Sequence, residues 1–593
     1  MSQTVADFIV ERLHSWGISR VYGYSGDGIN GVMGALQRAE GKVRLIQTRH
    51  EELAAFMACG HAKYTEQPGV VVTTSGPGAI HALNGLYDAR KDHMPVVAIV
   101  GQQARASLGS SYQQEVDLES LLKGVSEYSQ TLTTPAQARH VIDRAVRIAC
   151  AKRTVTCLVV PNDLQDAPMV NPEPEHGNTF SGIGYRPSVP VPASQDLDAA
   201  ADILNNGARV AILAGAGVRH AVEPLMLLAE RLGAGVAKAL LAKTMINDDH
   251  PLVTGGLGLL GTEPSDWMMS HCDTLLMVGT SFPYAEFLPH SGKVRCVQID
   301  VDAANLGLRF PTEVNLHGDA AATLEALLPL IQPRGNHEWA ESLRGRIERW
   351  WELLAERAEA PANPLNPQKV YRELSARLPP DALLACDVGT ATDWYARYLR
   401  ITSRGITGTT SGGLASMGAG VPYALAAKFA YPARPVIAMV GDGAMQMLGN
   451  NGLITLAQHW TEWHDPRFIV LVLNNQDLSQ VTWEQRAMEG EPKFETSQAL
   501  PPFEYDNYAN MLGLKGVRLD NPDDVGTVWE EAFNSNCPVV INAVVDANVP
   551  PLPTHFDFTQ VKSYLGSILK GDPESGQMLR QSFRSMAARY LKR

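Results

Sequence analysis

The stretch from Val436 to Asn475 decides the fold, and it reads VIAMVGDGAMQMLGNNGLITLAQHWTEWHDPRFIVLVLNN. An apolar run precedes Gly441, Asp442 and Gly443, and a helix-length segment leads to a second apolar run that ends in two asparagines. In an open parallel sheet, ligands bind at the carboxyl ends of the strands, where these polar residues would meet. Acidic and amide oxygens suit magnesium. The stretch therefore predicts a parallel α/β sheet that holds a metal-bound diphosphate.

Asp442 is expected where a strand ends and a helix begins. The backbone amides of Gly443, Ala444 and Met445 would then face an anion, while the carboxylate faces the metal. Asn475 would supply a side-chain oxygen, and two diphosphate oxygens, one main-chain carbonyl and a water would complete an octahedron. The alternative is a helix cap at Asp442 and a turn at the asparagine pair. The two features together favour the metal site.

Composition indicates a large globular enzyme. The chain has 593 residues, of which 45% are hydrophobic and 19% charged, with a net charge of −13. That length suggests about three or four domains, and the acidic balance argues against a nucleic-acid partner. The seven scattered cysteines include no Cys-x-x-Cys pair and are expected to be reduced. The amino terminus lacks the apolar core of a signal peptide, so we expect a cytoplasmic protein.

Alternating strand-like and helix-like segments predict three doubly wound parallel-sheet α/β domains. We expect a first domain over residues 1–167, a central Rossmann-like domain over 190–332 and a third domain over 369–546, followed by a tail over 547–593. A Pro- and Gly-rich connection separates the first two domains, and a segment with one predicted helix separates the last two.

Glu51 opens the predicted helix ELAAFMACGHA, and by itself it carries little information. Acidic residues are favoured in the first turn of any helix, because they complement its dipole. From the residues alone, a structural role for Glu51 is therefore favoured over a catalytic role. His50, His81 and His93 suit a structural role equally well.

Motifs along nearly the whole chain resemble thiamine-diphosphate enzymes of the acetolactate synthase and pyruvate oxidase group. The motifs are RHEELAAF at Arg49, SGPGAIHALNGLYDARKDHMPVVAIVGQ at Ser75, GAGVR at Gly215, VGTSFPYAEF at Val278, QIDVDAANLG at Gln298, SGGLASMGAGVP at Ser411 and the stretch from GDG to the asparagine pair. The Ser75, Val278 and Gln298 motifs are most similar to pyruvate oxidase and pyruvate:quinone dehydrogenase.

The resemblance implies roles for residues that the pattern alone leaves open. Glu51 would hydrogen-bond N1′ of the cofactor aminopyrimidine, and Met417 would wedge the cofactor into a V, which is a proximity effect. Gln114 and Glu484 would also be catalytic. The main-chain carbonyl of Asp477 would join Asp442 and Asn475 as a magnesium ligand. Further residues implied to bind the thiamine cofactor are Gly26, Gly389 and Thr390.

In the central domain the resemblance implies a bound flavin adenine dinucleotide. A glycine turn can admit a phosphate, and an acid can reach a ribose hydroxyl. The residues that match flavin-lining positions are Gly215, Gly217, Arg219, Ser281, Phe282, Asp300 and Asp319. The alternative is a flavin-free structural domain, as in some relatives.

Three departures from the family pattern bear on the substrate. The span from Asp442 to Asn475 is longer than expected, with extra material at TEWHDP that a surface-loop insertion would explain. Gln113 replaces the aromatic residue that usually precedes the active-site glutamine, here Gln114. Gln480 replaces a bulky apolar residue near substrate and flavin. The polar replacements leave the 2-oxo acid open, pyruvate included.

The resemblance implies oxidative decarboxylation of a 2-oxo acid such as pyruvate, with thiamine diphosphate, Mg²⁺ and FAD. The alternatives are a non-redox carboligase of acetolactate synthase type, a 2-oxo-acid decarboxylase and, from another class, a catalytically silent binding protein on the same fold. The family also implies a homodimer or homotetramer with sites shared between chains.

The tail ends in MLRQSFRSMAARYLKR, from Met578, with one apolar helical stripe among basic residues. This pattern suits a helix drawn to anionic lipid on the inner face of the cell membrane, which would make the protein peripheral there. It suits equally a helix that docks on the acidic body of the enzyme itself.

Overall fold

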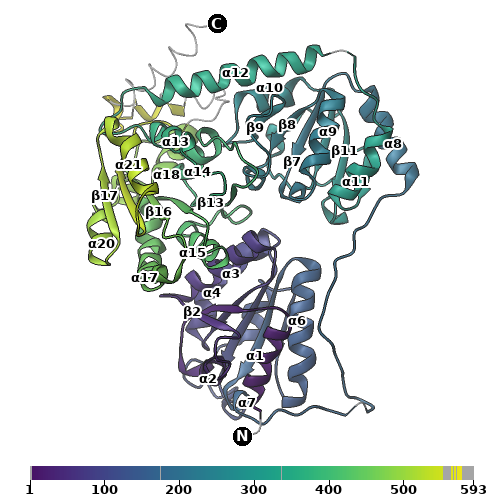
Figure 1. The fold of residues 1–593 in the computed structure, drawn as a ribbon, viewed down its shortest axis with the longest axis vertical. Helices are drawn as coiled ribbons and strands as arrows, with labels where there is room; N and C mark the ends of the chain where they lie inside the picture. Colours follow the sequence, from purple (N-terminus) through teal and green to yellow (C-terminus); the bar gives the residue numbers. More distant parts are fainter. Residues whose placement is uncertain are drawn as a thin grey trace.

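The computed structural model describes residues 3–173, 175–335, 337–551, 563–564, 566–568 and 570–576. Three six-stranded sheets follow one another along the chain, each flanked by helices (Figure 1). Their strand orders are β2-β1-β3-β4-β6-β5, β12-β11-β10-β7-β8-β9 and β14-β13-β15-β16-β18-β17. The first and third sheets share one topology, whereas the second has the 3-2-1-4-5-6 order of dinucleotide-binding sheets. Neighbouring strands pair in parallel in all three sheets. The predicted α/β class with three doubly wound sheets is confirmed.

The first sheet has central strands that are buried along their whole length, as expected when helices cover both faces. Its strands are β1 (Arg20–Gly23), β2 (Arg44–Gln47), β3 (Gly69–Thr73), β4 (Val96–Gln102), β5 (Tyr128–Thr131) and β6 (Val155–Pro161). Its helices are α1 (Val5–Ser15), α2 (Asn30–Arg38), α3 (Glu51–Thr65), α4 (Pro77–Lys91), α5 (Leu118–Lys123), α6 (Ala138–Lys152) and α7 (Asn162–Gln165).

An extended connection leads to the second sheet along the side of the molecule (Figure 1). The strands of that sheet are β7 (Val210–Ala214), β8 (Gly235–Lys238), β9 (Val253–Gly256), β10 (Thr274–Val278), β11 (Arg295–Asp300) and β12 (Val314–His317). Its helices are α8 (Ser194–Asn206), α9 (Val222–Leu232), α10 (Glu263–His271) and α11 (Ala320–Leu327). The predicted linker helix is α12 (Glu338–Ala358), which spans the top of the second and third sheets in Figure 1.

The third sheet carries the stretch from Val436 to Asn475. Its strands are β13 (Leu383–Cys386), β14 (Thr407–Thr409), β15 (Val436–Gly441), β16 (Phe468–Asn474), β17 (Lys515–Leu519) and β18 (Val539–Val544). Its helices are α13 (Pro367–Ser375), α14 (Thr390–Tyr398), α15 (Gly420–Ala430), α16 (Asp442–Ala444), α17 (Asn450–His459), α18 (Ser479–Glu484), α19 (Glu495–Gln498), α20 (Tyr505–Met511) and α21 (Val525–Phe533). One-turn π-helices follow α16 and α18.

The first and third sheets share one hydrophobic core, because α3 packs directly against α15. A Cβ atom at Gly60 of α3 would lie 2.9 Å from Cδ1 of Tyr423 in α15, so only glycine permits this approach. Phe56 adds an edge-to-face ring contact with Tyr423 at 6.1 Å. The two sheets are therefore joined rigidly within one chain.

Several sequence predictions can be compared with this fold. The seven cysteines are free thiols, and five of them are buried. The extra material at TEWHDP is not simply a surface loop, since Trp463 is buried and its ring stacks on Phe468 at 5.9 Å. Within the described residues, no helix is long and apolar enough to cross a bilayer. The predicted tail helix from Met578 lies outside the described residues, and the domain boundaries stay a prediction.

Candidate cofactor site

Asp442 joins the carboxyl ends of two neighbouring strands. It follows β15 as the first residue of α16, and only 3% of it is exposed. Its Oδ2 accepts the backbone N–H groups of Asn475, at 2.9 Å, and Gln476, at 2.6 Å. Its Oδ1 accepts the backbone N–H of Gly443 at 2.9 Å. The structure thus brings Asp442 and Asn475 together, and the backbone N–H of Gly443 donates to the Asp442 carboxylate.

The electrostatics of Asp442 fit a cation site. Burial raises the pKa of this carboxyl to about 6, while the three backbone donors act in the opposite direction. Within the described part of the chain, no lysine, arginine or histidine forms an ion pair with Asp442. Buried carboxylates are ordinarily paired or bound to a metal. A magnesium ion beside Asp442 would supply the missing positive charge, so the residues fit the metal that the sequence predicted.

Asn475 and Asp477 present the other predicted ligands. The Asn475 side chain donates to Ser479 Oγ at 3.0 Å and accepts the Asp477 backbone N–H at 3.1 Å. The Asp477 carboxylate is engaged elsewhere, since Lys493 Nζ lies 2.5 Å from Oδ2 and the Thr482 hydroxyl donates to Oδ1 at 2.5 Å. The Asp477 side chain therefore has protein partners, and its main-chain carbonyl stays the predicted metal ligand.

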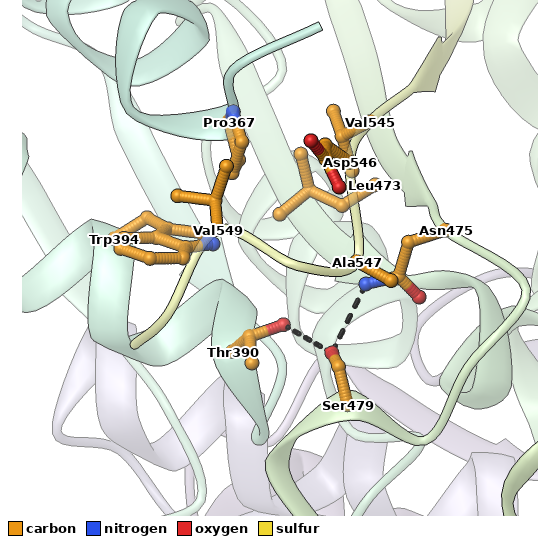
Figure 2. Close-up of a pocket in the computed structure, with 10 residues that line it drawn as sticks. All are labelled: Pro367, Thr390, Trp394, Leu473, Asn475, Ser479, Val545, Asp546, Ala547 and Val549. Atoms are coloured by element: carbon orange, nitrogen blue, oxygen red, sulfur yellow. Dashed lines mark hydrogen bonds between the residues drawn. The ribbon is translucent and has the colours of Figure 1, made fainter. Parts of the chain in front are cut away.

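Thr390 approaches the same point from the first turn of α14. Its hydroxyl lies 3.2 Å from Ser479 Oγ, so Ser479 bridges Thr390 and Asn475 (Figure 2). Gly389, which precedes the helix, has φ +90°, a conformation that favours glycine. A small pocket opens beside this bridge, and its lining residues are Pro367, Thr390, Trp394, Leu473, Asn475, Ser479, Val545, Asp546, Ala547 and Val549.

Met417 lies over the glycine turn. Its sulfur is 3.8 Å from the position that a Cβ atom at Gly443 would take. The same Cβ would lie 2.7 Å from Cδ2 of Leu478, so a residue larger than glycine would push into Leu478, while its distance to the Met417 sulfur is an ordinary van der Waals contact. Asp387 accepts the backbone N–H groups of Gly418, at 2.9 Å, and Gly420, at 2.7 Å, just after Met417 in the chain. The structure therefore places Met417 beside the predicted metal site.

Glu51 is the first residue of α3, where a helix terminus suits an acid, and it is 7% exposed. Its Oε2 lies 3.0 Å from Nδ1 of His81 in α4. The His50 and His81 rings stack with centroids 4.5 Å apart. Ligand atoms of these three residues lie within 4.8 Å of one another, and the group forms a small titratable cluster. Among the described residues, no hydrogen bond or ion pair links Glu51 to Met417 or Asp442.

The other residues predicted for catalysis and the thiamine cofactor are spread over two domains. Gln114 Oε1 accepts the Ser75 hydroxyl at 3.3 Å, and its backbone has φ +62°. Gly26 is explained by packing, since a Cβ there would lie 2.6 Å from Thr74 Cβ. Glu484 is exposed at the end of α18 and accepts the Gln480 amide at 3.0 Å.

The residues predicted for flavin share one edge of the second sheet. Each one ends a strand of that sheet or follows the carboxyl end of one: Gly215, Gly217 and Arg219 after β7, Ser281 and Phe282 after β10, Asp300 at the end of β11 and Asp319 after β12. This is where doubly wound sheets bind dinucleotides, so the placement fits a flavin nucleotide.

Most of the residues predicted to bind flavin already make contacts within the protein. A Cβ at Gly215 would lie 2.2 Å from the Gly279 carbonyl oxygen, so this glycine is also required by the neighbouring turn. Asp319 caps α11 by accepting the Ala322 backbone N–H at 3.0 Å. Arg219 donates to the Lys63 carbonyl of the first domain at 2.9 Å. Burial raises the pKa of Asp300, whose carboxylate accepts the Asp302 backbone N–H at 2.9 Å and the Asn305 side-chain amide at 3.5 Å.

Two residues in the cofactor site were not assigned a role from the sequence. His81 was treated as structural, yet it contacts Glu51 directly. Ser479 lies in no motif, although its place four residues after Asn475 in the first turn of α18 puts a hydroxyl beside the predicted ligands. A search for polar residues within one turn of a predicted ligand would have found it.

Three parallel α/β sheets, with the buried Asp442 beside Asn475 at one sheet edge, fit an enzyme that binds a diphosphate cofactor. The chain belongs to the thiamine pyrophosphate enzyme family. The N-terminal TPP binding domain of that family matches residues 3–121, the central domain 197–327 and the C-terminal TPP binding domain 387–543. The resemblance seen in the sequence is confirmed, and the protein is a thiamine-diphosphate-dependent enzyme.

Curated relatives span most of the chain. It is 33% identical over 568 residues to a putative thiamine pyrophosphate-containing protein, YdaP, of Bacillus subtilis, covering 96% of each chain. It is 30% identical over 553 residues to pyruvate oxidase of Lactiplantibacillus plantarum, covering 91% of this chain and 88% of the relative. It is 28% identical over 557 residues to a probable acetolactate synthase large subunit of Methanocaldococcus jannaschii, covering 91% and 92%. Both oxidative and non-redox enzymes are thus among the relatives.

Proposed function

We propose that the enzyme catalyses oxidative decarboxylation of a 2-oxo acid such as pyruvate, with thiamine diphosphate, Mg²⁺ and FAD. The observation that carries this proposal is the gathering of the flavin-matching residues, from Gly215 to Asp319, at the carboxyl edge of the second sheet. The similarity to a pyruvate oxidase over nearly the whole chain supports it.

In this proposal the protein holds the cofactor from both ends. Asp442, Asn475 and the Asp477 carbonyl would hold the magnesium ion, and Thr390 would contact the diphosphate. Met417 would support the cofactor from the side of the glycine turn. When bound, thiamine diphosphate supplies the carbon nucleophile that allows a 2-oxo acid to lose carbon dioxide.

Glu51 manages a proton in this proposal. Its carboxyl holds or releases a proton at N1′ of the aminopyrimidine, and the contact with His81 orients that carboxyl. Burial of Glu51 keeps water away from the exchanging proton. The flavin would supply a two-electron acceptor, held by the glycine turn after β7 and by Asp300.

A second candidate is a non-redox carboligase of acetolactate synthase type. The hydrogen bond from Gln480 to Glu484 favours it, because a polar pair suits a more polar acceptor than an apolar wall does. The similarity to acetolactate synthases is also extensive.

The absorption spectrum of the purified protein separates the two candidates. We expect flavin bands that pyruvate bleaches under anaerobic conditions, with release of carbon dioxide and no acetolactate. Acetolactate formed without bleaching would instead establish the carboligase. A protein that releases no carbon dioxide from pyruvate or other 2-oxo acids when loaded with thiamine diphosphate and magnesium would overturn both.

We further propose that the active form is a homodimer or homotetramer. Glu51 has no contact with Asp442 in the described part of one chain, so a second chain would bring the two residues to one cofactor. Exposed apolar side chains beside the predicted site residues support a partner surface, notably Ile80 next to His81 and Val481 next to Gln480.

A further inference from the structure

The segment that carries Met417 is held by the first domain. We call residues 410–418 the Met417 loop. Its Ser411 hydroxyl donates to Asp88 Oδ1 at 2.5 Å. The backbone N–H groups of Gly412 and Gly413 donate to the Asp92 carboxylate at 2.9 and 2.5 Å. Both acids belong to α4 or its C-terminal cap, so a helix of the first domain binds a loop of the third.

The same acids form a buried charged network. Lys63 of α3 is 3% exposed, and its Nζ donates to Asp92 Oδ2 at 2.5 Å and to the Thr410 carbonyl at 2.6 Å. Burial opposes the charge of Lys63, but Asp92 and Asp88 outweigh it and raise its pKa. Asp88 is fully buried and also accepts the Tyr423 hydroxyl and the Cys59 thiol. Such buried charges are tolerated only with well-placed partners, so the network fixes the loop backbone.

The conformation of the loop requires that support. Ala415 has φ +53°, the left-handed region that a residue with a side chain adopts only when its surroundings impose it. The Ser411 hydroxyl accepts the backbone N–H of Ser416 at 2.8 Å while it donates to Asp88, which closes the loop on itself. Asn84 of α4 donates to the Ser416 hydroxyl at 2.8 Å. Met417 follows directly and is therefore positioned by contacts with α4.

We propose that Asp88 and Asp92 are positioning residues for the thiamine-diphosphate site, acting through the Met417 loop. The inference rests on the proposed role of Met417 in supporting the cofactor. The same helix α4 carries His81, which contacts Glu51. One helix of the first domain thus aligns two groups that the proposed function requires, the carboxyl of Glu51 and the thioether of Met417.

The test removes one hydroxyl at the loop and one at a matched control position. Ser411→Ala removes the 2.5 Å hydrogen bond to Asp88, and Ser181→Ala removes a 2.5 Å hydrogen bond to Asp143. Asp143 is a buried acid of the first domain that forms an ion pair with Arg12. The dissociation constant of thiamine diphosphate is measured on apo-protein with magnesium, by intrinsic fluorescence, and the thermal midpoint is recorded for both variants. Ser411→Thr, which keeps the hydroxyl, serves as the rescue variant.

We expect Ser411→Ala to weaken thiamine-diphosphate affinity at least about tenfold and Ser411→Thr to restore most of it. Ser181→Ala should lower only the thermal midpoint. If Ser411→Ala does not fold, Asn84→Ala tests the same loop from the half-buried flank of α4 and should weaken binding about threefold. Equal cofactor affinity in the Ser411 and Ser181 variants, or in Asn84→Ala and the parent, would overturn the inference.

The outcome also separates this inference from the proposed function. If Asp442→Ala abolishes cofactor binding while Ser411→Ala leaves it unchanged, the metal site stands and only the positioning role fails. If Asp442→Ala leaves binding unchanged, the proposed site itself is wrong. The readout is cofactor affinity, so it does not depend on whether the enzyme is an oxidase or a carboligase.

Discussion

Replacing Glu51 by glutamine should stop the proton chemistry and leave the fold nearly intact. Glutamine has the same length and volume, and its side-chain oxygen can still accept a hydrogen from His81 Nδ1, 3.0 Å away in the parent protein. Hydrogen bonds to charged groups contribute about 1.5–3 kcal/mol and neutral ones about 1 kcal/mol. The free energy of unfolding should therefore fall by no more than about 2 kcal/mol.

Turnover should fall far more. An amide cannot take up or release a proton at N1′, and general acid–base groups contribute roughly 10²–10⁴-fold. We expect a loss of at least about a hundredfold, which corresponds to about 2.7 kcal/mol of barrier. Thiamine-diphosphate affinity should change little, because the proposed ligands of the diphosphate and magnesium lie in the third domain.

The assay measures carbon dioxide release from saturating pyruvate, with cofactor affinity by fluorescence on the same samples. Glu127→Gln is the control, since Glu127 is a surface acid of the first domain that pairs with Lys152. Near-normal turnover of Glu51→Gln, or an equal loss in the control, would refute the assigned role. Loss of cofactor binding together with turnover would point to a structural role instead.

Three further predictions concern the third domain and the assembly. Asp442→Ala should abolish magnesium-dependent retention of thiamine diphosphate in equilibrium dialysis, because it removes the buried charge at the metal site. Mixing inactive Glu51→Gln and Asp442→Ala proteins should restore part of the activity after subunit exchange, whereas mixtures that stay inactive would contradict shared sites. Burial raises the pKa of Asp393 to about 7 although Arg397 opposes it, so the folded state binds this proton more tightly than the unfolded state does. The contribution of Asp393 to the free energy of unfolding should therefore decline as pH rises from about 4 to about 7. Urea titrations at pH 5 and 8 should show a smaller difference in that free energy for Asp393→Asn than for the parent protein. A larger difference in the variant would contradict this prediction.

The fold could be predicted because its signals are local. The apolar run VIAMV became β15 and FIVLVL became β16, each buried along nearly its whole length. Parallel pairing then required the residues after the two strands to meet, and Asp442 indeed accepts the Asn475 amide. In this part of the chain, one strand pattern and one topological rule were sufficient to place two site residues side by side.

The contacts that sequence reasoning missed depend on which helices cross. His81 reaches Glu51 only because α4 packs along α3, and no spacing within either helix reports that. Glycine motifs leave the prediction of a flavin site open for another reason, since one residue can serve both phosphate binding and chain packing. Gly215 faces the Gly279 carbonyl, so its presence is explained without a flavin, whereas its place after β7 fits one.

The packing of α3 against α15 constrains how the site can be completed. Gly60 lies against Tyr423 so closely that the helices cannot approach further, and the shared core behind them is continuous. Sliding α3 to carry Glu51 towards Asp442 would also break the pair between Lys63 and Asp92 inside that core. A second chain could instead bring its own Asp442 to Glu51 and leave this core undisturbed. The rigid contact that fixes the Met417 loop is therefore also the physical reason to expect that Glu51 works on the cofactor of a partner chain.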